Sequence, residues 1–230
     1  MQAQFKIEYA SAARELAIDI DTLVVAGWAG RDLAAIEHHI EELAAIGVPR
    51  PSSVPLYYRI GHNQLTQADT VQVVGPHSSG EIETFIFAAE GQLYVSIASD
   101  HTDRKLESHS VALSKQICPK PAGRSAWLYA EVEAHWDELM VRSWIEENGQ
   151  RVLYQEGPLS TLRTPRELIS GYLAATGLAQ LPDGTGMSCG TVAAIGGIRP
   201  ANVFEMELYD PRLQRSLKHS YTLQILPEVA

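Results

Sequence analysis

Residues 80–104 read GEIETFIFAAEGQLYVSIASDHTDR, in which two short apolar runs are separated by Glu90-Gly91. Apolar runs rich in β-branched and aromatic residues on either side of a two-residue turn that contains glycine predict a β-hairpin. With this turn, the numbers of two paired residues add up to 181, so Glu81 lies opposite Asp100. The stretch therefore predicts a hairpin whose open end carries acidic side chains.

A third carboxylate belongs to the same end of this hairpin. Glu83 stands two residues after Glu81, and side chains at i and i+2 of a strand share a face. Because like charges on one face cost stability, such a group either raises a pKa or binds a cation. Three carboxylates suit Mg²⁺, Mn²⁺ or Ca²⁺ better than a soft metal. The alternative from spacing alone is that Glu81 and Glu83 form the solvated face of an edge strand.

The rest of the chain is also rich in β signals, with a few helices. The Asn148-Gly149 pair predicts a second tight hairpin. A helix is expected after Asp32, a plausible N-cap, and a short one over 103–115. Thr164-Pro165-Arg166-Glu167 has the order of a capping box and predicts a helix from about 165 to 175, and LYAEVEAHW, 128–136, predicts a strand. We expect an α+β chain dominated by β structure, in one domain over residues 1–230.

Composition excludes several classes of protein. The 230 residues are 45% hydrophobic and 20% charged, and the formal net charge is −10, which argues against a nucleic-acid binder and a polybasic membrane surface. Cys118 and Cys189 stand 71 positions apart, so we expect no disulfide framework and a reducing cytoplasm. The N-terminus lacks the apolar core of a signal peptide, and no apolar run is long enough for a transmembrane helix.

Six short motifs, in order, resemble those of the fumarylacetoacetate hydrolase superfamily, and more narrowly a bacterial branch that is labelled only as a domain of unknown function. They are His39-Ile40-Glu41-Glu42, Glu81-Ile82-Glu83, Ser99-Asp100-His101-Thr102-Asp103-Arg104, Lys115 in Leu113-Ser114-Lys115-Gln116, Gln155 after the second hairpin, and Gly190-Thr191-Val192. The resemblance implies a rolled mixed β-sandwich with a lid helix, in which residues 1–55 hold the first strands and the lid and residues 56–230 form the catalytic β-roll.

The same resemblance implies a chemistry and a role for each motif. It predicts a metal-dependent hydrolase that cleaves a C–C bond in a small 2-oxo or β-diketo acid, in a catabolic pathway. The ion, Mg²⁺ or Mn²⁺ with Ca²⁺ as a further candidate, would be held by Glu81, Glu83 and Asp100 and would stabilise an enolate. Lys115 would stabilise the oxyanion, and the lid pair His39 and Glu42 would activate water. The residues expected at the substrate are Arg104, Gln155, Gly190 and Thr191, and for Arg104 we favour a bidentate pair with Asp100.

Departures from the family pattern leave alternatives open. Ser99, Lys105 and Val192 replace the usual asparagine, aspartate and proline, and the lid pair could instead be His38 with Glu41. The chain could also be a decarboxylase or isomerase of a 2-oxo acid, or a non-catalytic dimer that binds a small molecule. A homodimer is expected in each case, by resemblance.

Overall fold

The hairpin of residues 80–104 lies in the middle of the larger sheet of the computed structural model, which describes residues 1–9, 12–45 and 47–229. Its strands are β8 (Ile82–Ala89) and β9 (Gln92–Ser99). Glu90 and Gly91 have φ values of 53° and 69°, the left-handed conformation that a type I′ turn requires. Glu83 pairs with Ala98, which confirms the predicted register.

The larger sheet contains eight strands in the order β2-β1-β12-β9-β8-β15-β3-β4. The other six strands are β1 (Gln2–Glu8), β2 (Ala13–Asp19), β3 (Thr22–Gly27), β4 (Leu56–Ile60), β12 (Ser125–Leu128) and β15 (Thr185–Ser188). Residues of β8 and β9 contribute alternately to two hydrophobic cores, one on each face of the sheet, so these strands read as nearly continuous apolar runs.

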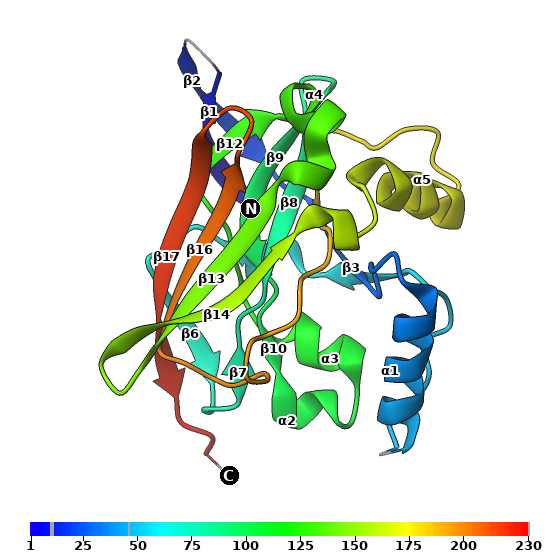
Figure 1. The fold of residues 1–230 in the computed structure, drawn as a ribbon, viewed down its shortest axis with the longest axis vertical. Helices are drawn as coiled ribbons and strands as arrows, with labels where there is room; N and C mark the ends of the chain where they lie inside the picture. Colours follow the sequence, from blue (N-terminus) through cyan, green and yellow to red (C-terminus); the bar gives the residue numbers. More distant parts are fainter. Residues whose placement is uncertain (10–11, 46, 230) are drawn as a thin grey trace.

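A second sheet of five strands, in the order β14-β13-β16-β17-β6, lies across β8 and β9 (Figure 1). Its members are β6 (Thr70–Val74), β13 (Met140–Glu147), β14 (Gln150–Pro158), β16 (Val203–Asp210) and β17 (Arg215–Leu226). Two small ladders complete the β structure: β7 (Ser78–Ser79) with β10 (Thr102–Asp103), and β5 (Leu65–Thr66) with β11 (Lys120–Pro121). The Asn148-Gly149 turn joins β13 to β14 with φ values of 53° and 74°, as predicted.

Alternation along β8 separates two cores. Ile82 and Ile86 belong to the core shared with the five-stranded sheet. Phe85 and Phe87 belong to the core on the opposite face, with β1 and β3. Glu83 lies two residues before Phe85 and so points to the same face of β8. Its carboxylate therefore lies on the face that the five-stranded sheet leaves free.

The helices are short and lie outside the sheets. They are α1 (Leu33–Ala45), α2 (Arg104–Glu107), α3 (Val111–Gln116), α4 (Tyr129–Val132) and α5 (Pro165–Thr176), with 3-10 turns η1 (His62–Gln64), η2 (Glu133–Glu138) and η3 (Leu159–Thr161). Asp32 caps α1 by accepting from the N–H groups of Ala34 and Ala35, and the predicted capping box begins α5. The helix expected over 103–115 is two helices, because Ser110 caps a new one by accepting from the Leu113 N–H.

The strand predicted for residues 128–136 was wrong. Leu128 ends β12, and residues 129–136 form α4 and the start of η2 instead. Tyr129, Val132 and Trp136 are its buried apolar residues, and they recur at helical rather than alternating spacing. The apolar residues of LYAEVEAHW therefore have helical spacing, although we predicted a strand.

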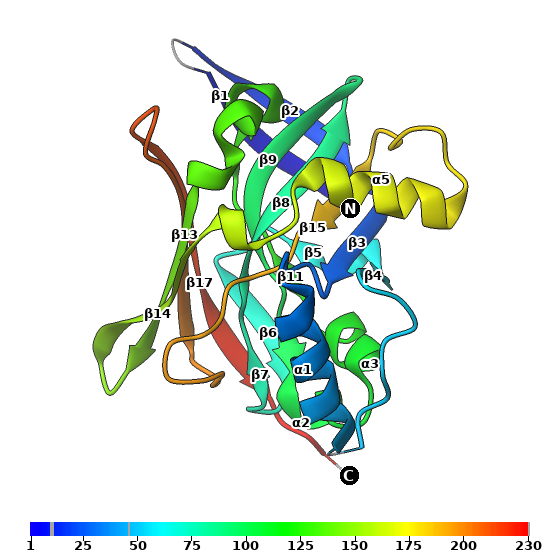
Figure 2. The same cartoon turned by 45° about the vertical axis from the view of Figure 1, so that its right-hand side comes forward.

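These elements confirm the predicted class, a β-dominated α+β fold built from curled mixed sheets. The views in Figures 1 and 2 agree that α1 lies beside α3. In the described part of the chain, the helices are all too short or too polar to cross a membrane. The single domain over 1–230 stays a prediction.

Candidate active site

The three carboxylates predicted to converge lie together at the open end of the β8–β9 hairpin. Asp100 directly follows β9, and its N–H donates to the carbonyl of Glu81 at 2.9 Å. Asp100 is fully buried, Glu83 is 4% exposed, and Glu81 is partly buried. The alternative of a solvated edge-strand face is therefore excluded for Glu83, since β8 is an interior strand.

Asp100 is paired with the predicted lysine. The Nζ atom of Lys115, on α3, lies 2.5 Å from Oδ2 of Asp100 and 3.9 Å from a carboxylate oxygen of Glu81. Burial alone would lower the pKa of Lys115, but the charges of Asp100 and Glu81 outweigh it and hold that pKa above its usual value. Lys115 is therefore a fixed positive charge within the carboxylate group.

A second lysine, which the sequence did not indicate, contacts the other oxygen of Asp100. Lys120 is 1% exposed, and its Nζ lies 3.2 Å from Oδ1 of Asp100. Burial would raise the pKa of Asp100, but Lys115 and Lys120 outweigh burial and hold that pKa below its usual value. The only sequence signal is that Lys120 stands between Pro119 and Pro121.

Glu83 has the opposite electrostatic character. Burial and the charge of Asp100 raise the pKa of Glu83 well above its usual value. Oε2 of Glu83 accepts the N–H of Gly190 at 3.0 Å, which ties the carboxylate to the predicted substrate loop. Two adjacent carboxylates thus have shifts of opposite sign, a pattern typical of functional sites.

The predicted pair between Arg104 and Asp100 was wrong. Arg104 begins α2, and its Nη2 lies 3.2 Å from Glu81 while its Nη1 donates to Glu107 at 2.9 Å. Its Nε donates to the hydroxyl of Ser79. The geometry differs from the prediction because Lys115 and Lys120 already contact both oxygens of Asp100.

Gln155 and Thr191 form a clamp beside the carboxylates. The carbonyl oxygen of the Gln155 side chain accepts from the N–H of Ile82 and the hydroxyl of Ser143. Its amide nitrogen donates to the hydroxyl of Thr191 at 2.8 Å and to the carbonyl of Val192 at 2.7 Å. All of this amide's bonding capacity is used within the protein. Gln155 therefore holds the loop that carries Thr191 against β8.

The lid helix α1 places the predicted base pair on its exposed surface. Nδ1 of His39 lies 3.3 Å from Oε2 of Glu42, and Nε2 of His38 lies 3.3 Å from the other oxygen of the same carboxylate. Glu42 thus contacts both histidines. The ring of His39 also lies 5.8 Å from the ring of Trp28, measured between centroids. Since α1 lies beside α3, this pair is carried by the helix next to Lys115 (Figure 2).

The donor set fits a hard divalent ion in its chemistry. Asp100, Glu81 and Glu83 offer carboxylate oxygens, and Oδ1 of Asp100 is buried without a hydrogen bond from any described residue. However, within residues 1–9, 12–45 and 47–229, no three His, Cys, Asp or Glu side chains are placed to hold an ion together. As the side chains stand, Asp100 and Glu81 face the protein's own cations.

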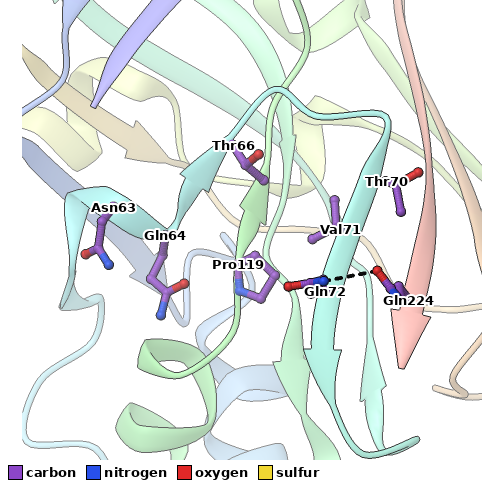
Figure 3. Close-up of a pocket in the computed structure, with 8 residues that line it drawn as sticks. All are labelled: Asn63, Gln64, Thr66, Thr70, Val71, Gln72, Pro119 and Gln224. Atoms are coloured by element: carbon purple, nitrogen blue, oxygen red, sulfur yellow. Dashed lines mark hydrogen bonds between the residues drawn. The ribbon is translucent and has the colours of Figure 1, made fainter. Parts of the chain in front are cut away.

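A pocket of about 420 Å³ lies elsewhere, between β5, β6 and the loop at Pro119 (Figure 3). It is lined by the uncharged residues Asn63, Gln64, Thr66, Thr70, Val71, Gln72, Pro119 and Gln224. Across this pocket, Gln72 donates to Gln224 at 3.0 Å. It contains none of the predicted site residues, so it is not the candidate active site.

A family described as "Protein of unknown function (DUF2848)" matches residues 26–221. The chain belongs to this family. That match spans most of the chain, including the lid helix, the carboxylate hairpin and the Gly190-Thr191 loop. The search of curated proteins found no match.

Solved structures share the fold of this family member. The 2-keto-3-deoxy-D-arabinonate dehydratase complexed with magnesium and 2,5-dioxopentanoate matches with a TM-score of 0.65 and 16% identity, over 95% of this chain and 78% of its own. Cg1458 matches with a TM-score of 0.63 and 14% identity, over 96% of this chain and 86% of its own. The 4-oxalocrotonate decarboxylase from Pseudomonas putida G7, complexed with calcium and acetate, matches with a TM-score of 0.51 and 17% identity, over 88% of this chain and 76% of its own. These neighbours confirm the fumarylacetoacetate hydrolase-like fold.

Proposed function

We propose that the chain is an enzyme that acts on a small 2-oxo or β-diketo acid with the help of a divalent ion. The observation that carries this proposal is the convergence of Glu81, Glu83 and Asp100 with Lys115 on one buried strand end. Buried carboxylates that crowd one another are costly unless they serve a cation or a reaction. Neighbours of the same fold carry magnesium with 2,5-dioxopentanoate and calcium with acetate, which supports this ligand class.

In this proposal Glu81, Glu83 and Asp100 hold Mg²⁺ or Mn²⁺, with Ca²⁺ as a substitute. When bound, such an ion polarises a carbonyl oxygen and stabilises negative charge that develops on it. Lys115 holds a proton on Nζ and presents a positive charge beside the same position. The clamp of Gln155 fixes Thr191 and its neighbouring glycine at the edge of the site.

We propose hydrolysis of a C–C bond as the reaction, with the lid pair as the base. An imidazole can take a proton from water as a general base, and Glu42 orients the ring of His39 through its 3.3 Å contact. The exposure of this pair favours a lid that covers the substrate from outside. The competing reaction is decarboxylation or dehydration, as the names of two structural neighbours suggest, and it needs no water-activating pair.

A panel of substrates tests both the proposed substrate class and the need for a divalent ion. Acylpyruvates, β-diketo acids and 2-oxo acids are incubated with the wild type in Mg²⁺, Mn²⁺ or EDTA, and loss of enol absorbance is followed. We expect turnover that EDTA and Glu83→Gln abolish. Turnover that survives both would refute a role for the ion.

The reaction class is then decided by His39→Ala, with the exposed His62→Ala as its matched control. We expect a loss in kcat of about 10²–10⁴-fold for His39→Ala only, the usual contribution of a general base. Full activity in His39→Ala would exclude hydrolysis by the lid pair and leave decarboxylation or dehydration. We also propose a homodimer in the cytoplasm, which gel filtration of the wild type tests for the oligomeric state.

A further inference from the structure

Lys120 is a buried cation that the proposed chemistry does not use. Its ammonium group is 1% exposed and has three N–H donors. Three carbonyl oxygens surround it, those of His101 at 2.6 Å, Lys115 at 2.6 Å and Cys118 at 3.2 Å. These carbonyls use the hydrogen-bonding capacity of Nζ and fix its place between β10, α3 and the loop before β11.

The contact between Lys120 and Asp100 is a buried ion pair. Nζ of Lys120 lies 3.2 Å from Oδ1 of Asp100, yet that oxygen accepts no hydrogen bond from any described residue. Lys115 bonds the other oxygen, Oδ2, at 2.5 Å. Asp100 is thus neutralised from both sides, while one of its oxygens keeps a free lone pair.

We propose that Lys120 is the internal cation that neutralises Asp100 in the metal-free protein and, by its charge, weakens the binding of a divalent ion there. The part concerning the ion rests on the proposed function; the internal ion pair does not. A positive charge held beside a ligand oxygen repels an incoming cation, and in a buried site this repulsion is poorly screened. In return, it allows the carboxylate to be buried when no ion is present.

The test combines Lys120→Met with Lys120→Gln, whose amide keeps two N–H donors for the surrounding carbonyls and so protects the loop. Lys6→Met, on the exposed side of β1, is the matched control. Calorimetric titration with Mn²⁺ should show binding about tenfold tighter or more in both Lys120 variants than in the wild type or the control. Thermal unfolding in EDTA should show both Lys120 variants to be less stable. If the wild type binds Mn²⁺, unchanged or weaker binding in a folded Lys120 variant would overturn the proposal.

A double-mutant cycle separates this inference from the proposed function. Lys120→Met, Asp100→Asn and the double variant are compared by thermal unfolding in EDTA. If the wild type binds no Mn²⁺, the proposed function fails, and the cycle alone decides the role of Lys120. A coupling in which Asp100→Asn relieves most of the loss caused by Lys120→Met supports the internal ion pair. Additive losses refute it.

Discussion

Asp100 and Glu83 are neighbouring buried carboxylates whose neutralisation should have opposite effects on stability. Asp100 is fully buried, with Lys115 at 2.5 Å and Lys120 at 3.2 Å. Asp100→Asn leaves the buried ammonium group of Lys120 without its anion and leaves Lys115 only the more distant Glu81, at 3.9 Å. Breaking a buried pair in this way costs about 3–5 kcal/mol. At about 2–4 °C per kcal/mol for a chain of this size, the melting temperature of the metal-free protein should fall by about 6–20 °C.

Glu83→Gln should instead stabilise the metal-free protein. Burial and the charge of Asp100 hold the pKa of Glu83 well above its usual value, so the folded state disfavours the ionised form. The glutamine has the same shape and can still accept the N–H of Gly190. One pKa unit corresponds to about 1.36 kcal/mol, so at pH 7 the gain is bounded by the interval from about 4.3 to 7, roughly 3–4 kcal/mol.

Differential scanning calorimetry in EDTA from pH 4 to pH 8 checks both signs. A carboxyl with a raised pKa contributes its stability below the unfolded pKa and loses it as the pH rises toward the folded pKa. The advantage of Glu83→Gln should therefore be near zero at pH 4 and grow toward neutrality. Because the pKa of Asp100 is lowered, Asp100→Asn should be less stable than the wild type at neutral pH, and part of this difference in stability should disappear in acid. The exposed Glu15→Gln on β2 is the control. A Glu83→Gln variant less stable than the wild type at pH 7 would refute the reasoning.

Two further predictions concern Gly190, in the loop beside the site, and Asp210, a buried carboxylate at the end of β16. Gly190 has φ +89°, and a Cβ there would lie 2.6 Å from Cβ of Ala29, so Gly190→Ala should cost about 1–3 kcal/mol in thermal unfolding and weaken Mn²⁺ binding. Gly149→Ala, at φ +74° with no atom within 4 Å, is the control and should leave Mn²⁺ binding intact. Burial would raise the pKa of Asp210, but backbone N–H groups and His135 hold it below its usual value. The ionised carboxylate therefore stabilises the fold above about pH 3.9, and this stabilisation is lost in acid. Asp210→Asn should unfold more easily than the wild type at pH 7, and its free energy of unfolding should change less with pH below pH 4. The same pH dependence in the variant and the wild type below pH 4 would contradict this.

Local signals were sufficient for the central hairpin. The Glu90-Gly91 turn has only one favoured geometry, and a fixed turn together with a period of two determines the register and the face of every residue on both strands. The convergence of Glu81, Glu83 and Asp100 follows from those two facts. That part of the site could be predicted because it depends on neighbours in sequence.

The cations around the carboxylates could not be assigned in the same way. Lys120 lies in the two-residue strand β11, between Pro119 and Pro121. Its hydrogen-bond partners are backbone carbonyls, which have no signature in the sequence. Arg104 was assigned to Asp100 because a ligand carboxylate needs a positive partner, but two lysines already fill that role. Which cation contacts which carboxylate depends on how α2 and α3 pack on the hairpin, and tertiary packing is not encoded in local spacing.

The balance of these charges bears on how the proposed anionic substrate would be attracted to an acidic protein. Glu81, Glu83 and Asp100 are matched in number by Arg104, Lys115 and Lys120, so when fully ionised the site adds nothing to the formal net charge of −10. That entire excess lies elsewhere and repels an anionic oxo-acid, although salt screens it beyond about 8–10 Å. A divalent ion added to a neutral site makes it positive by two charges, which act at short range in a buried, poorly screened place. The ion would then attract the substrate as well as polarise its carbonyl group. A protein without the ion should bind 2-oxo acids weakly even when Glu81, Glu83 and Asp100 are all present.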